Sequence, residues 1–160
     1  MNGAHWHLIV NHLPIFFPMT GLLVLLTGIL FKSPAVKQVA LGLFIFGAVS
    51  TFAAMESGEG AEGVIKIIDA NAKSLIHRHE EFAEKLALFN YALGAIGLVA
   101  LWANWKQKKF AGILQYECIA LAVLGLYFGS RTGTTGGEIR HTEIRTGEVI
   151  SAPTKENEHD

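Results

Sequence analysis

Charged residues avoid four long apolar stretches of the chain. Each stretch has about 20 residues, which is the length an α-helix needs to cross the ~30 Å hydrocarbon core of a bilayer. The pattern therefore predicts an all-α integral membrane protein, an up-down bundle of four transmembrane helices within residues 1–130. The stretches run from about 13 to 31, 35 to 55, 82 to 105 and 110 to 129.

Two polar segments interrupt or follow this pattern. Between the second and third stretches, residues 57–81 place apolar side chains among small and polar ones, which predicts a short amphipathic helix lying in the membrane interface. After Ser130 the composition changes abruptly, and Gly133, Gly136 and Gly137 are typical of turns. Residues 131–160 are therefore expected to form a small tail outside the membrane, with a disordered charged end.

The charges of the connections predict the orientation. The two short connections carry lysines and no acidic residue, and basic short loops remain in the cytoplasm. The segment 57–81 is instead rich in acids. Both termini are therefore expected on the outer side of the membrane. The lysines concerned are Lys32, Lys37, Lys106, Lys108 and Lys109.

Composition narrows the function classes. Of the 160 residues, 51% are hydrophobic, and the formal net charge of −1 gives no indication of nucleic-acid binding. The single cysteine, Cys118, lies in the fourth stretch and belongs to no CxxCH or CxxC pattern. Covalently attached haem and thiolate zinc sites are thereby excluded.

Histidines gather at one membrane face. A neutral imidazole binds iron, copper or zinc, so a cluster at one depth favours a bound cofactor or metal over isolated interfacial side chains. The seventh histidine, His159, lies near the end of the tail. The six on the predicted outer face are His5, His7, His12, His77, His79 and His141.

Depth separates these six histidines. His12 stands one residue before the first apolar stretch and His79 three before the third, on helices running in the same direction. We therefore expect His12 and His79 to be axial ligands of a haem b. Secondary candidates for a second haem or for propionate contacts are His7, His77, His141, Arg131, Arg140 and Arg145, and candidate acceptors for the ligand N–H groups are Glu56, Glu80 and Glu81.

Two alternatives remain open. The same histidines, His12, His79, His7 and His77, with Glu80, are also suited to a single transition-metal ion in a non-haem membrane protein. The chain is equally compatible with a structural subunit of a larger membrane complex. A stand-alone hydrolase is disfavoured, because no serine or cysteine nucleophile accompanies the histidines in a known motif.

Acidic residues in or beside the stretches are further candidates. Glu117 lies eight residues into the fourth stretch, where a charge costs about 3 kcal/mol on insertion scales. Glu117 and its neighbour Tyr116, together with Glu56, are therefore candidates for proton transfer or quinone contact. The alternative for Glu117 is a protonated side chain that hydrogen-bonds between helices.

The spacing His7-x4-His12-x-Pro14 resembles the HPxxVHFP signature of an uncharacterised bacterial membrane family of about four spans. The HRHEEFAE start of the third stretch and the TGTTGG segment are also similar to that family. Leu8 departs from its usual proline, and His141 lies nearer the glycines than its usual histidine. The resemblance implies an inner-membrane b-type cytochrome, its termini in the periplasm, that passes electrons to c-type cytochromes or works with other subunits and quinone.

Overall fold

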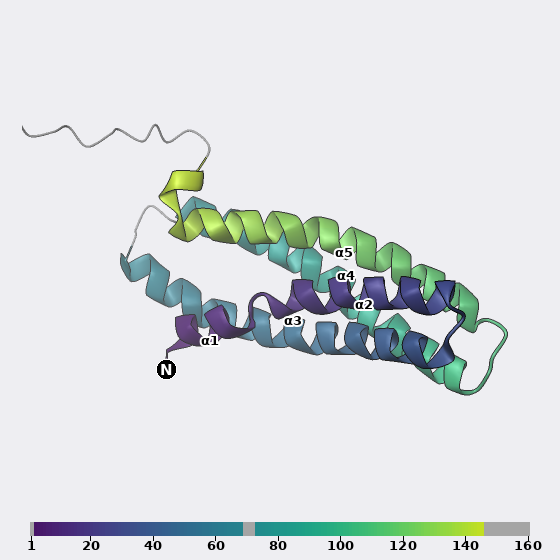
Figure 1. Ribbon diagram of the computed structural model, residues 1–160. Coiled ribbons are helices and arrows are strands. Elements are labelled where there is room, and N and C mark those ends of the chain that lie inside the picture. The colour runs from purple at the N-terminus through teal and green to yellow at the C-terminus, as the bar shows by residue number, and fades with distance from the viewer. Residues whose placement is uncertain (1, 69–72, 146–160) are drawn as a thin grey trace, which may run out of the picture.

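A computed structural model describes residues 2–68 and 73–145, and these residues are helical throughout apart from short connections. Figure 1 shows the long helices lying side by side, with the α2–α3 and α4–α5 connections at the same end of the bundle. The elements are α1 (Gly3–Val10), α2 (Leu13–Leu30), α3 (Pro34–Ile68), α4 (Lys73–Trp105), α5 (Ala111–Arg140) and the short 3-10 helix η2 (Thr142–Ile144).

Four helical segments are long and apolar enough to cross a membrane, as the sequence predicts. They are Gly3–Leu30, Pro34–Val64, Lys73–Trp105 and Ala111–Arg140. We call the end that holds the two connections the lysine end, after Lys32, Lys106 and Lys108, and the opposite end the histidine end, because it holds His7 and His79.

Two sequence-based expectations about the histidine end require correction. The separate interfacial helix predicted within 57–81 does not form, because α3 continues unbroken to Ile68. Likewise α5 continues through the glycines to Arg140 rather than ending near residue 129. In α5 the reason is packing, since Thr132, Thr135 and Glu138 are buried and stabilise the extra turns. The end of the predicted tail, 146–160 with His159, lies outside the described residues.

The N-terminal helix α1 was not expected. The Asn2 side chain accepts a hydrogen bond from the His5 backbone N–H and caps this helix. A Cβ added to Gly3 would stand 2.7 Å from the Cα of Gly60, so two glycines allow α1 to lie directly on α3. This contact also covers the part of α3 that extends beyond the apolar stretch.

The interior of the bundle is packed with apolar and small side chains. Glycines lie where helices approach most closely, as small residues do between membrane helices. At Gly94 of α4, an added Cβ would stand 2.4 Å from the Cβ of Ala48 on α3. Fully buried core residues include Leu25, Leu41, Phe44, Leu93, Cys118 and Ala122.

A buried asparagine donates a hydrogen bond to a carbonyl of α2 that a proline leaves without its helical donor. Pro18 has no N–H, so the carbonyl of Pro14 loses its helical donor. Asn90 of α4 supplies one: its Nδ2 lies 2.8 Å from the Pro14 oxygen and 2.8 Å from Thr51 Oγ1 on α3. Asn90 is 1% exposed and thereby joins three helices in the core.

We expect Asn90→Leu to lower the free energy of unfolding by about 1–3 kcal/mol, because it leaves the Pro14 carbonyl buried without a donor. Asn104→Leu in the same helix is the matched control, since the buried Asn104 Nδ2 has no hydrogen-bond partner to lose. Thermal melts of both purified variants measure the difference. Equal melting temperatures would contradict this role of Asn90.

Candidate functional site

The histidine end contains two His-x-His pairs, one in each half of the chain. His5 and His7 lie on α1, and His77 and His79 lie at the start of α4. In each pair the first histidine is exposed and the second is half-buried. The half-buried members, His7 and His79, are therefore the ones whose surroundings the fold determines.

His7 is anchored on α3. Its Nδ1 lies 3.1 Å from the backbone oxygen of Ala54 and 3.1 Å from Ser57 Oγ. The Ser57 hydroxyl itself donates to the Ala54 oxygen at 3.0 Å, so it accepts from His7. Gly58 lies beside the ring, where an added Cβ would be 3.7 Å from His7 Cε1.

His79 is anchored on α5 in the same way. Its Nδ1 lies 3.1 Å from the backbone oxygen of Thr132 and 3.3 Å from Thr135 Oγ1. The Thr135 hydroxyl is within 3.2 Å of the Thr132 oxygen. At Gly136 an added Cβ would be 3.0 Å from His79 Cε1, so any larger residue would crowd the ring in this position.

The two anchors have the same arrangement along their helices. Each consists of a residue whose backbone carbonyl accepts from the histidine, a hydroxyl residue three positions after it and a glycine four positions after it. The match extends along the bundle. Phe17 stands ten residues after His7, and its Cβ lies 3.5 Å from a Cβ added at Gly47. Phe89 stands ten residues after His79, and its Cβ lies 3.6 Å from a Cβ added at Gly125. Each of these glycines precedes its anchor glycine by eleven residues. Two parts of the bundle thus correspond, and we call them the helix pairs. In the first, α1 and α2 pack on α3, and in the second α4 packs on α5, so the two pairs are parallel structural repeats.

The lysine end shows the same correspondence. Lys32 and Gln107 both adopt a left-handed backbone conformation, with φ of 52° and 53°. The next residue in each connection, Ser33 or Lys108, donates its N–H back into the preceding helix at 2.9 Å. This is the hydrogen bond of a Schellman motif, so equivalent turns close both helix pairs.

The anchors set the protonation of both rings. A carbonyl oxygen only accepts hydrogen bonds, so Nδ1 of His7 and of His79 must carry a proton. In a neutral imidazole the lone pair then lies on Nε2, the atom left to bind a metal ion. The two rings belong to different parts of the bundle, because His7 lies on α1 and His79 on α4.

The other predicted histidines have different surroundings. His12 holds the N-cap position of α2 without a capping hydrogen bond from its side chain. It is exposed, its ring lies 6.5 Å from that of Phe16, and no anchor like that of His7 holds it among the described residues. His77 is exposed, and its Nε2 is 3.4 Å from a carboxylate oxygen of Glu81.

His141 follows α5 and contacts the η2 helix. Its exposed ring has Nδ1 2.9 Å from Glu143 Oε1. The pKa of the Glu143 carboxyl is lowered, first by the backbone N–H of Glu143 and second by the His141 side chain. His141 is thus paired locally.

The predicted proton and quinone candidates lie on the surface of the bundle. Glu56, Tyr116 and Glu117 are exposed, with Tyr116 at 65%. The side chains of Tyr116 and Glu117 therefore lie on the exposed surface of α5, away from His7 and His79.

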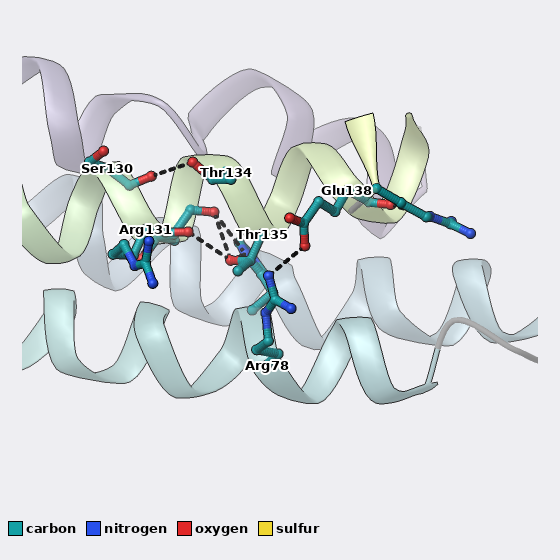
Figure 2. A network of polar contacts seen from close by, with 9 residues as sticks. Arg78, Ser130, Arg131, Thr134, Thr135 and Glu138 are labelled. Carbon is teal, nitrogen blue, oxygen red and sulfur yellow. Dashed lines mark hydrogen bonds and ion pairs between the residues drawn. The ribbon is translucent and has the colours of Figure 1, made fainter. Parts of the chain in front are cut away.

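Sequence reasoning missed the ion pair between Arg78 and Glu138. Figure 2 shows Arg78 reaching from α4 to α5, where its Nη2 lies 2.7 Å from Glu138 Oε2. Glu138 is 6% exposed, a burial that the glycine-rich sequence around it did not indicate. Of the predicted arginines, Arg131 lies over the Phe82 ring at 5.6 Å, Arg140 is exposed, and Arg145 donates to the backbone oxygens of Glu138 and Ile139.

Residues 2–68 and 73–145 contain no group of three or more His, Cys, Asp or Glu side chains placed to hold a metal ion. What this region offers is a pair of anchored imidazoles.

Comparison with known proteins yields no match to a family model, to a curated protein or to a solved structure. The resemblance to the four-span membrane family therefore stays a prediction.

Proposed function

We propose that this chain is a membrane-bound b-type cytochrome or cytochrome subunit, with His7 and His79 as the axial ligands of a haem at the histidine end. The observation that carries the proposal is the pair of equivalent anchors, which hold two imidazoles in the same tautomer on different helix pairs. Anchoring of Nδ1 to a carbonyl is the usual support of a metal-bound histidine.

The residues present fit such a group. Bis-histidine ligation needs two Nε2 atoms, and the anchors of His7 and His79 leave this atom of each ring unprotonated. Gly58 and Gly136 let each imidazole ring pack directly against the helix that anchors it. Figure 1 shows α1 lying beside α3 and α4 lying beside α5 at this end, and each of these two pairs contributes one histidine. A bound haem would supply one-electron redox chemistry.

His7 replaces His12 in this proposal. The sequence favoured His12 because of its depth, but depth does not orient a ring. His7 has two acceptors on α3 for its Nδ1, whereas His12 is exposed at the start of α2. His12, close to His7, is then suited to contacts at the edge of the site.

The charge pattern supports an orientation. The lysine end carries Lys32, Lys106 and Lys108, and short basic connections remain cytoplasmic. The histidine end would then face the periplasm of a bacterial inner membrane. There the protein would exchange electrons with a c-type cytochrome, a quinol or another subunit of a membrane complex.

Absorption spectroscopy tests the proposal. Protein purified from haem-replete cells is expected to show a Soret band and an α band that sharpens on reduction, together with extractable haem b. A colourless preparation would overturn the proposal. Stoichiometric copper, zinc or iron without porphyrin would instead support the non-haem metal-binding alternative.

A further inference from the structure

A second polar feature lies beside the His79 anchor, between α4 and α5. A cavity of about 310 Å³ is lined by Arg78 and Phe82 of α4 and by Arg131, Thr134 and Thr135 of α5. Arg78 and Phe82 are one helical turn apart, as are Arg131 and Thr134 or Thr135. The cavity is thus a continuous hollow along the junction of the two helices.

The lining carries an excess of positive charge. Arg78 shares one of its donor groups with the buried Glu138, and half of its side chain remains exposed. Arg131 makes no ion pair with any described residue, and its guanidinium lies 5.6 Å from the centre of the Phe82 ring. Lys85 Nζ lies 5.4 Å from the same ring. Three cations, Arg78, Arg131 and Lys85, therefore lie at or beside the cavity, and among them Arg78 is paired with a carboxylate.

The threonines do not supply donors to a ligand. Thr134 donates its hydroxyl hydrogen to the Ser130 oxygen at 3.0 Å, and Thr135 donates to the Arg131 oxygen at 2.9 Å. Figure 2 shows these bonds directed into α5. The free donors at the cavity are thus guanidinium N–H groups, which bind phosphate oxygens in a bidentate manner.

The position of the cavity along the bundle indicates the source of the anion. Phe82 begins the third apolar stretch, so Arg78 and Arg131 lie at the boundary between the polar end of the bundle and its apolar part. Lipid phosphates occupy this level in a bilayer, and basic pockets between membrane helices bind anionic headgroups. The Phe82 ring adds an apolar surface for the glycerol and first acyl carbons.

We propose that the cavity between α4 and α5 binds the phosphate group of an anionic phospholipid through Arg78 and Arg131. The cavity shares Thr135 with the His79 anchor, but the two arginines that would hold the phosphate are neither proposed haem ligands nor anchors of His7 or His79. It predicts a lipid preference that holds whether or not the protein binds a cofactor.

The test uses the full-length protein in detergent, titrated with phosphatidylglycerol or with phosphatidylcholine of the same acyl chains. Phosphatidylglycerol is expected to raise the melting temperature more. Arg131→Gln should weaken the phosphatidylglycerol effect by about tenfold in apparent affinity, as expected on losing a charge-assisted contact. Arg140→Gln is the matched control, because Arg140 lies on the same helix, is exposed and does not line the cavity.

Three outcomes would overturn the proposal. The first is an equal response of the parent protein to both lipids. The second is an equal loss of the lipid preference in Arg131→Gln and Arg140→Gln. The third is the same protection by inorganic phosphate alone at millimolar concentration, which would assign the site to a soluble anion. If Arg131→Gln does not fold, Arg131→Lys replaces it. Lysine keeps the charge but not the bidentate geometry, so an unchanged affinity would also contradict the assignment.

Discussion

Alanine in place of either His7 or His79 is expected to abolish the haem absorption bands, whereas alanine in place of His5 or His77 leaves them intact. The reason is that only the second histidine of each pair has its Nδ1 held by a backbone carbonyl and an adjacent hydroxyl. Without either imidazole, a bound haem would lose one of the two protein ligands that we propose for it. Haem content per chain and the reduced-minus-oxidised spectrum measure the effect.

The control for this prediction is contained in the chain itself. His5 and His77 lie two residues from the proposed ligands, on the same helices, and are exposed. A fifth variant, His12→Ala, distinguishes the structural assignment from the one based on depth. Retention of the bands in His12→Ala, with unchanged helical content in all variants, is expected. Loss in His12→Ala but not in His7→Ala would return the assignment to His12.

Leucine in place of Gly94 is expected to lower the free energy of unfolding by about 3 kcal/mol or more, the upper part of the range for overpacked cores. Even the first carbon of a side chain at Gly94 would stand 2.4 Å from Ala48 Cβ, so α3 and α4 must move apart. That movement also strains the Asn90 contact with Thr51 of α3, because Asn90 lies one turn away on α4.

Gly42→Leu on α3 provides the matched comparison. An added Cβ at Gly42 meets no atom within 4 Å, so the same substitution can be accommodated there. Thermal melts of the two variants in one detergent are expected to differ by many degrees. Equal stability would show that α3 and α4 are not held at this separation in the folded protein.

The two helix pairs explain why the fold places equivalent chemistry at one end. The anchor residues Ala54, Ser57 and Gly58 on α3 and Thr132, Thr135 and Gly136 on α5 lie at matching distances from Gly47 and Gly125. The sequence contains this correspondence as an A/T-x-x-S/T-G pattern together with two His-x-His pairs. The pattern is too short to be identified until the contacts show which histidine each copy holds.

Hydropathy by itself determined four helices long and apolar enough to span a membrane, and with them the end of the bundle where His7 and His79 lie. These features follow from local composition, because about 20 consecutive apolar residues leave the backbone of a membrane segment no alternative to a helix. The lengths of α3 and α5 did not follow from it. Glycines and polar residues near Gly58 and Gly136 indicate turns locally, but packing of α1 on α3 and of α4 on α5 keeps these segments helical.

Tertiary structure alone decided which histidine is held and by what. Depth along a helix selected His12, since depth can be counted from the sequence, whereas the anchor of His7 joins residues 47 and 50 positions apart. The Arg78 and Glu138 pair spans 60 positions and was likewise invisible to local patterns. Side-chain contacts between helices depend on rotation about each helix axis, and this rotation is set by close packing at residues such as Gly3, Gly94 and Gly136.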